Sequence, residues 1–418
     1  MLDIKFIREN PEKVKTACKD RGMVCDVDMI LSLDQKRRSF IQEIEGLRAQ
    51  QNKLGLRRLQ TGQLAEAQNL KQQIKQKESE LENVEQEFQK LLLQLPNIPL
   101  EDVPVGKDET ANKVVREWGK QPTFPFQPKD HVALGENLGL IDVERAAKVA
   151  GSRFAFLKND LVLLEFALVD LILKTAVKEK FIPVVPPVLL KQEAMKAMGY
   201  LDTPQDLAER YFLEKDKLFL AGTSEHSVGA MHKDEVFNEK DLPRRYVAFS
   251  TCFREEAGSY GKDTKGILRV HQFDKVEFVS FTMREESKKE LEFLVKLEEK
   301  LWQMLKIPYR VVQLCTGDLA RPSAITFDIE AWLPGQQKYR EMSSASNTTD
   351  FQARRLNTRF RGKAGILEYV HILNATGFAI GRTLIAILEN YQQKEGSVKI
   401  PKVLQRYVGK SEIKNRVN

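Results

Sequence analysis

The chain has 418 residues, of which 42% are hydrophobic, so it is long enough to form two or three domains with buried cores. Its formal net charge of +7 favours a polyanionic partner, most simply nucleic acid. The four cysteines form no CxxC pair, which argues against a disulfide framework and a zinc site. Because there is neither an apolar signal core nor a run of about 18 apolar residues, we expect a cytoplasmic protein with no membrane segment.

The N-terminal region is predicted to be helical. Within residues 1–26, Asn10-Pro11-Glu12 is typical of a helix start with proline at the first position. From about Val27 to Leu95 apolar residues recur in steps of three and four, which is a heptad seam interrupted at Thr61-Gly62 and ended by Pro96. This pattern predicts two helices of about thirty residues folded into an antiparallel hairpin, a rod about 45 Å long.

The outer faces of this predicted rod are basic. They carry Arg48, Lys53, Arg57, Arg58, Lys71 and Lys75. Heptad rods most often serve as solvated coiled coils or dimerisation elements. Basic residues towards the tip instead favour a support that holds a long polyanion, and the sequence leaves both interpretations open.

The remainder of the chain is predicted to form a second domain. The N-terminal domain is expected to cover residues 1–105, with a proline-rich linker at 106–130 and the second domain at 131–418. Helices are expected at Asp142–Val149, Asp160–Lys178 and Leu291–Leu305. The apolar run Phe181–Leu190 contains three prolines, which predicts an edge strand or an extended interface segment. Strands grouped among helices, without βαβ alternation, predict an α+β domain with an antiparallel sheet.

A charged hairpin is the central feature of this second domain. Two strands are expected at Tyr246–Phe253 and Ile267–Val279. Arg254 and Glu256 are two residues apart, so on a strand they point to the same face. Arg269 and Glu277 also share one parity on the second strand. A sheet face that carries alternating arginine and glutamate either lies in solvent as a set of ion pairs or binds a polar ligand.

The polar residues of the sequence favour catalysis by positioning and charge neutralisation. No P-loop, GxGxxG fingerprint or HExxH motif occurs, and the five histidines lack metal-ligand spacing. The remaining polar set comprises Glu225, Arg254, Glu256, Arg269, Glu277, Glu341, Ser344 and Arg382. Arginines bind phosphate through paired hydrogen bonds, and a glutamate beside a serine hydroxyl can hold Mg²⁺. This set suits phosphoryl or nucleotidyl transfer by positioning and charge neutralisation.

These residues and their order resemble the class II aminoacyl-tRNA synthetases. FREEAGSYGKDTKGILRVHQFDKVE is similar to their second signature motif in its seryl form, and GFAIGRTLIAILENYQ is similar to the third. YREMSSASNTTDFQARR and the N-terminal rod also resemble the seryl-tRNA synthetase family. The segment Phe181–Leu190 stands where the first motif, at the dimer interface, is expected. The resemblance covers essentially the whole chain.

The resemblance implies an activity and partners. The enzyme would activate L-serine with ATP to seryl-adenylate and transfer serine to the 3′ end of tRNA(Ser), with tRNA(Sec) as a second candidate acceptor. Mg²⁺ would be the cofactor, the coiled-coil arm of about residues 27–95 would bind tRNA(Ser), and a homodimer would form through the Phe181–Leu190 region. Two alternatives stay open at this point: a related ligase that charges a carrier protein, and a tRNA binder with an inactive catalytic domain.

The resemblance also implies roles for single residues. Arg254 and Arg382 would be catalytic, with Arg254 between the α-phosphate and the serine carboxylate and Arg382 on the γ-phosphate. Glu341 and Ser344 would hold Mg²⁺. The implied serine-binding residues are Thr223, Ser224, Glu225, Arg254, Glu277, Asn374 and Thr376. The implied ATP-binding residues are Arg254, Glu255, Glu256, Val270, Phe273, Glu341, Met342, Ser343, Ser344 and Arg382.

Two positions depart from the family pattern. Ser224 stands where alanine is common, which would add a polar group to the wall of the serine pocket. Ala375 stands where a glycine is usual. If that position requires a positive φ, Ala375 would be strained.

Overall fold

The computed structural model describes residues 1–55, 61–257 and 265–414. The chain divides into two compact units, Met1–Pro96 and Asn97–Asn418. Within the described ranges, no helix combines the length and the apolar character needed to cross a membrane.

The first unit is helical, as predicted. It contains α1 (Ile4–Glu9), α2 (Pro11–Asp20), α3 (Val27–Gly55) and α4 (Thr61–Gln94). Pro11 is the first residue of α2, where its missing N–H costs no hydrogen bond.

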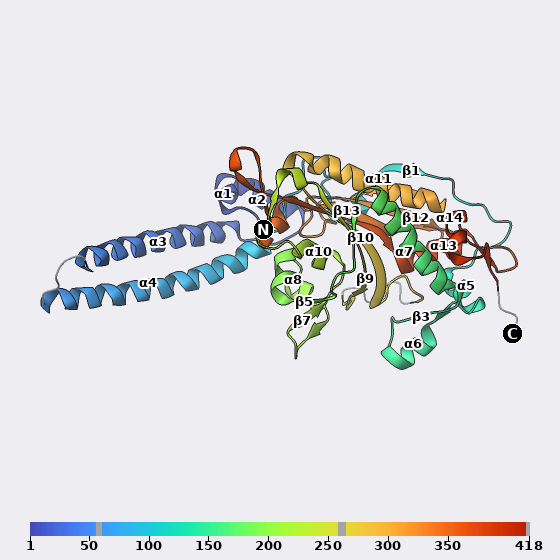
Figure 1. Ribbon diagram of the computed structural model, residues 1–418, viewed down its shortest axis with the longest axis horizontal. Coiled ribbons are helices and arrows are strands. Elements are labelled where there is room, and N and C mark those ends of the chain that lie inside the picture. Colours follow the sequence, from blue (N-terminus) through green and yellow to red (C-terminus); the bar gives the residue numbers. More distant parts are fainter. Residues whose placement is uncertain (56–60, 258–264, 415–418) are drawn as a thin grey trace. The chain divides into compact units, whose positions relative to one another are not determined.

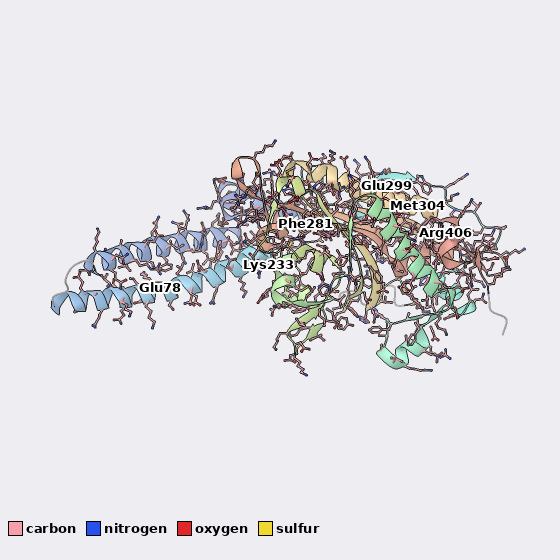
Figure 2. All side chains as sticks on the ribbon, viewed as in Figure 1. Glu78, Lys233, Phe281, Glu299, Met304 and Arg406 are labelled. Atoms are coloured by element: carbon pink, nitrogen blue, oxygen red, sulfur yellow. The ribbon has the colours of Figure 1, made fainter. Side chains whose placement is uncertain are left out.

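Helices α3 and α4 form the predicted antiparallel arm and lie side by side in Figure 1. Arg48 of α3 contacts Glu78 of α4 at 2.7 Å, and Lys77 contacts Glu43 at 2.9 Å. Glu78 is labelled on α4 in Figure 2. The predicted division into two helices is confirmed, but Thr61 and Gly62 belong to the start of α4. The predicted basic residues Arg57 and Arg58 lie outside the described residues.

The second unit is built on an eight-stranded sheet. Its order is β1 (Lys113–Trp118), β11 (Tyr309–Gln313), β12 (Ile325–Leu333), β13 (Lys338–Asn347), β16 (His371–Ala379), β10 (Gln272–Thr282), β9 (Arg244–Phe253) and β4 (Ile182–Val184). All neighbours are antiparallel except β4 and β9. The α+β class with a mainly antiparallel sheet is therefore confirmed, and so is the edge strand within Phe181–Leu190.

Helices and small sheets surround this sheet. The helices are α5 (His131–Asn137), α6 (Val143–Ala150), α7 (Asp160–Lys178), α8 (Gln192–Met198), α9 (Pro204–Ala208), α10 (Glu225–Ala230), α11 (Ser287–Leu305), α12 (Phe351–Leu356), α13 (Ile380–Asn390) and α14 (Lys402–Val408). The small sheets are β5 (Leu189–Lys191), β7 (Leu218–Leu220) and β6 (Phe212–Leu213); β15 (Leu367–Tyr369), β14 (Arg359–Arg361) and β8 (Val236–Asn238); β2 (Ile141–Asp142) with β3 (Phe156–Leu157); and β17 (Val398–Lys399) with β18 (Glu412–Ile413).

Two predicted boundaries need correction. The expected linker at 106–130 belongs to the second unit and contributes β1, because Lys113–Trp118 pairs with β11. The second strand of the charged hairpin begins at Gln272, so Arg269 precedes it.

One continuous hydrophobic core joins the sheet to α7, α11 and α13. Trp302 of α11 is fully buried and packs edge-to-face on Phe378 of β16, with ring centroids 5.5 Å apart. A large buried aromatic pair of this kind anchors the helix to the strand. The opposite side chains of β16 and its neighbours are therefore free to line a site.

Candidate active site

A cavity of about 550 Å³ in the second unit brings most of the predicted residues together. Of the predicted residues, the following line it: Thr223, Glu225, Arg254, Glu256, Val270, Phe273, Glu277, Glu341, Met342, Ser343, Ser344, Asn374, Thr376 and Arg382. They come from β10, β13, β16, the starts of α10 and α13, and the described ends of the connection between β9 and β10. A volume of this size suits a small-molecule ligand.

Arg254 is held just beyond the end of β9. Its backbone N–H donates to the carbonyl of His271 at 2.9 Å, and its Nε donates to the carbonyl of Gly222 at 3.2 Å. Its guanidinium lies 5.4 Å from the centroid of the Phe273 ring. These contacts fix a forked cation in the cavity wall, which is the geometry that binds phosphate or carboxylate.

Glu256 also lines the cavity, but its position does not follow from the alternation of side chains along a strand. It lies beyond β9 and has a φ of 53°, in the left-handed region. Its Oε2 accepts from Nη1 of Arg269 at 2.5 Å, and Arg269 also lines the cavity. Arg254 and Glu256 both line the cavity, as predicted. Neither residue lies in a strand, so the alternation of side chains along a strand does not explain why they share it.

Glu225 is buried at the start of α10. It accepts hydrogen bonds from the Tyr200 hydroxyl at 3.1 Å and from Nε2 of Gln352 at 2.9 Å. Burial raises the pKa of the Glu225 carboxyl above its ordinary value, although both hydrogen bonds act in the opposite direction. A buried carboxylate at the cavity wall is a natural partner for an ammonium group.

Two β-bulges set which side chains face the cavity. On β13, Met342 is the extra residue: Glu341 lies opposite Glu330 and Ser344 opposite Asp328. Since Glu330 and Asp328 are two residues apart on β12, Glu341 and Ser344 point to one side although they are three residues apart. On β16, Gly377 is the extra residue, since Thr376 lies opposite Glu277 and Phe378 opposite Val276.

Glu341 and Arg382 form a second pair of charged groups in the cavity lining. Nη1 of Arg382 donates to the Glu341 carbonyl at 2.9 Å and lies 3.3 Å from its Oε1. The Arg382 guanidinium lowers the pKa of the Glu341 carboxyl. Ionised Glu341 and the nearby Ser344 hydroxyl supply the oxygen ligands that Mg²⁺ prefers.

Two predicted residues lie outside the cavity lining, and a third, Ser343, turns its hydroxyl away from the cavity. The Ser343 hydroxyl accepts from Nε1 of Trp302 at 3.2 Å, so it points into the core. Ser224 is fully buried outside the lining, and its Oγ has no hydrogen-bond partner among the described residues. Glu255 is also outside the lining, and its N–H donates to the Glu209 carbonyl at 3.2 Å. Ala375 lies in β16 without a positive φ, so the strain considered for it does not arise.

The structure adds residues that sequence reasoning missed. Tyr200, Arg210, His226 and Lys275 line the cavity. Burial lowers the pKa of Arg210, and the neighbouring Arg254 lowers it further. Tyr200 and Arg210 arrive from distant parts of the chain, so no local pattern marks them. Lys275 did have a signal, because it is two residues from Glu277 on the same strand.

Comparison with known families matches both units. The seryl-tRNA synthetase N-terminal domain matches residues 1–99, and the tRNA synthetase class II core domain (G, H, P, S and T) matches residues 211–391. A serine–tRNA ligase from Thermodesulfovibrio yellowstonii is 47% identical over 422 residues, which cover 98% of this chain and 99% of that protein.

Solved structures agree with these matches. The crystal structure of seryl-tRNA synthetase from Pyrococcus horikoshii complexed with ATP has a TM-score of 0.92 at 43% identity and covers 99% of both chains. The cytoplasmic serine-tRNA ligase from Naegleria fowleri in complex with AMP has a TM-score of 0.88 at 34% identity, covering 100% of this chain and 99% of that one. Likeness of this extent over both units shows that the chain belongs to the seryl-tRNA synthetase family of the class II aminoacyl-tRNA synthetases.

Proposed function

We propose that the chain is a serine–tRNA ligase, which activates L-serine with ATP and transfers the seryl group to tRNA(Ser). The observation that carries this proposal is one cavity lined by the arginines Arg254 and Arg382 together with the buried glutamates Glu225 and Glu277. Full-length relatives with this name support the same activity.

The first step needs position and charge, with no proton transfer. The serine carboxylate attacks the α-phosphorus of ATP, a P–O bond forms, and pyrophosphate leaves as an anion. Arg254 lies where a forked cation can hold the α-phosphate and the serine carboxylate together, and Arg382 would take the γ-phosphate. Val270 and the ring of Phe273 would pack on adenine, and Glu256 would accept from its amino group.

The residues present fit a magnesium ion. The bulge at Met342 directs Glu341 and Ser344 to one side, and Arg382 favours the ionised form of Glu341. Glu341 and Ser344 would hold Mg²⁺, which neutralises charge on the ATP phosphates when it is bound.

Selectivity for serine would come from the buried glutamates. Glu225 would face the ammonium group, while Glu277, with Thr376 and Asn374 beside it, would accept from the serine hydroxyl. Alanine would leave the Glu277 acceptor unpaired, at a cost of about 1–3 kcal/mol. Thr223 would complete the wall near the ammonium group.

The second step would use the first unit. A terminal ribose hydroxyl of tRNA(Ser) attacks the acyl carbon of seryl-adenylate, and AMP leaves. The arm α3–α4, with exposed lysines such as Lys71 and Lys75, would hold the tRNA mostly by its shape and phosphates. We place the reaction in the cytoplasm and the active form as a homodimer through the Phe181–Leu190 region, with tRNA(Sec) as a second acceptor.

ATP–pyrophosphate exchange with a panel of amino acids tests this proposal. Serine should support exchange, and alanine and threonine should be much poorer substrates. Charging should then occur on tRNA(Ser) and not on a carrier protein. If the wild type shows no exchange with serine, the ligase function is wrong and a tRNA binder remains.

Arg254→Ala separates catalysis from tRNA binding. The variant should lose about a hundredfold or more in exchange rate, because it lacks the fixed cation at the reacting phosphate, yet it should bind tRNA like the wild type. Arg145→Ala is the matched control, since Arg145 lies in α6 with its side chain 71% exposed. Equal losses in both variants would contradict the role of Arg254.

A further inference from the structure

A buried lysine lies in the cavity beside the proposed serine-hydroxyl acceptor. Lys275 is 6% exposed and lines the cavity from β10. Its Nζ forms an ion pair with Oε2 of Glu277, which is 1% exposed. Side chains two residues apart on a strand share a face, so the strand itself presents the two groups together.

The surroundings of Glu277 make a cation necessary there. Glu225 at the start of α10 is 4% exposed, and Glu298 of α11 is fully buried; both carboxyls interact with Glu277. A carboxylate buried among carboxyls is unfavourable unless a cation and hydrogen bonds compensate it. Among the described residues, Lys275 is the cation in ion-pair contact with Glu277.

The contacts also orient the carboxylate. The Thr376 hydroxyl donates to Oε2 of Glu277 at 3.3 Å, and Lys275 contacts the same oxygen. Both groups therefore hold one oxygen of Glu277, which leaves Oε1 to accept from a ligand hydroxyl. The register agrees with this arrangement, because Thr376 lies directly opposite Glu277 across the bulge.

We infer that Lys275 is a positioning residue for amino-acid selection, whose ammonium holds Glu277 as the ionised, oriented acceptor of the substrate hydroxyl. This inference rests on the proposed function, because it gives Glu277 the serine hydroxyl as its ligand. Because Lys275 acts through Glu277, replacing Lys275 should weaken the recognition of serine. The proposed ATP-binding residues should stay intact.

Lys275→Met tests the inference, since methionine keeps much of the volume and removes the charge. In ATP–pyrophosphate exchange, the KM for serine should rise about tenfold or more, while the KM for ATP stays within about threefold. The preference for serine over alanine should fall by a similar factor. A folded variant with an unchanged KM for serine, or with equal rises in both KM values, would overturn the inference.

The double variant Lys275→Met/Glu277→Gln gives a second test. It removes both charges, so it avoids the unpaired carboxylate that could prevent Lys275→Met from folding. If Lys275 acts through Glu277, the double variant should match Glu277→Gln alone within about threefold in kcat/KM for serine. A further tenfold loss would overturn the inference. Wild-type exchange with serine is measured alongside, because its absence would reject the proposed function itself.

Discussion

Three charged side chains of the cavity are held by groups from other parts of the chain. Arg254 is held by the Gly222 carbonyl, Glu225 by Tyr200 and Gln352, and Glu341 by Arg382. Groups that are already oriented need little reorganisation when charge develops on a phosphate. At the residue scale, this arrangement explains how the site can work without a proton-transferring residue.

The raised pKa of Glu225 predicts a pH dependence. Burial raises this pKa above the ordinary value of 4.5, with a further contribution from Glu277, while Gln352, Lys275 and Tyr200 oppose the shift. The carboxylate therefore takes up a proton at a higher pH than an exposed glutamate does. In the proposed function Glu225 faces the serine ammonium, and a neutral Glu225 would not balance that charge. The kcat/KM for serine should therefore fall as the pH is lowered through this raised pKa.

Exchange assays at varied pH would check this dependence, with Glu225→Gln as the comparison. The variant should bind serine about a hundredfold more weakly and should lack this acidic decline. An identical decline in the variant would show that another group titrates.

At the scale of single elements, the bulges decide the composition of the site. Gly377 is the extra residue of β16, and a Cβ there would lie 3.1 Å from the Val276 carbonyl oxygen and 3.3 Å from the Phe278 ring. Gly377→Ala should therefore destabilise the second unit by about 1–3 kcal/mol and raise the KM for serine, because Thr376 and Glu277 adjoin the bulge.

Gly46→Ala is the matched control for this substitution. A Cβ at Gly46 meets no atom within 4 Å, and the residue lies inside α3. This change should stabilise the arm by about 0.5–1 kcal/mol and leave the KM for serine unchanged. Thermal unfolding and exchange kinetics check both variants. A Gly377→Ala protein with wild-type stability and KM would show that the bulge tolerates a side chain.

The arm carries its own prediction. Lys71 and Lys75 are exposed and four residues apart on α4, while Leu70 and Ile74 are buried. The double variant Lys71→Ala/Lys75→Ala should bind tRNA more weakly. The slope of log K against log salt should become shallower by about one unit for each phosphate that the variant no longer binds. Serine-dependent exchange should not change, since the cavity lies in the second unit. An unchanged salt slope would exclude these lysines from the tRNA surface.

At the scale of the whole molecule, an exposed apolar surface near β4 supports the proposed dimer. Val185 is 81% exposed and Ile182 39%, and helix α7 exposes Leu163, Phe166 and Val177. Exposed large apolar side chains of this kind are typical of interaction surfaces. Val185→Asp should shift the protein from dimer to monomer in light scattering after gel filtration. Val24→Asp is the control, because Val24 is fully exposed in the first unit. A wild type of monomeric mass would contradict the dimer.

Much of this protein follows from patterns within short stretches of sequence. The heptad seam of α3 and α4, the start of α2 at Pro11, and α7 at Asp160–Lys178 depend on spacing along one helix, so local residues determine them. The stretches that resemble the class II motifs likewise predicted Arg254, Glu277, Glu341 and Arg382 as site residues. The structure brings all four to one cavity.

The tertiary structure decided those features that depend on strand register and on residues distant in the sequence. A bulge at Met342 brought Ser344 beside Glu341, and the contact with Trp302 turned the Ser343 hydroxyl into the core. Arg116 and its neighbours became strand β1 because β11 offered a pairing edge. Pairing across a sheet joins residues that are far apart in the chain, and one extra residue reverses which face a side chain takes. The spacing of residues along the chain does not reveal strand pairing or bulges. The sequence by itself therefore determined the helices and the charged residue types of the site, and the tertiary structure decided which of these residues share the cavity.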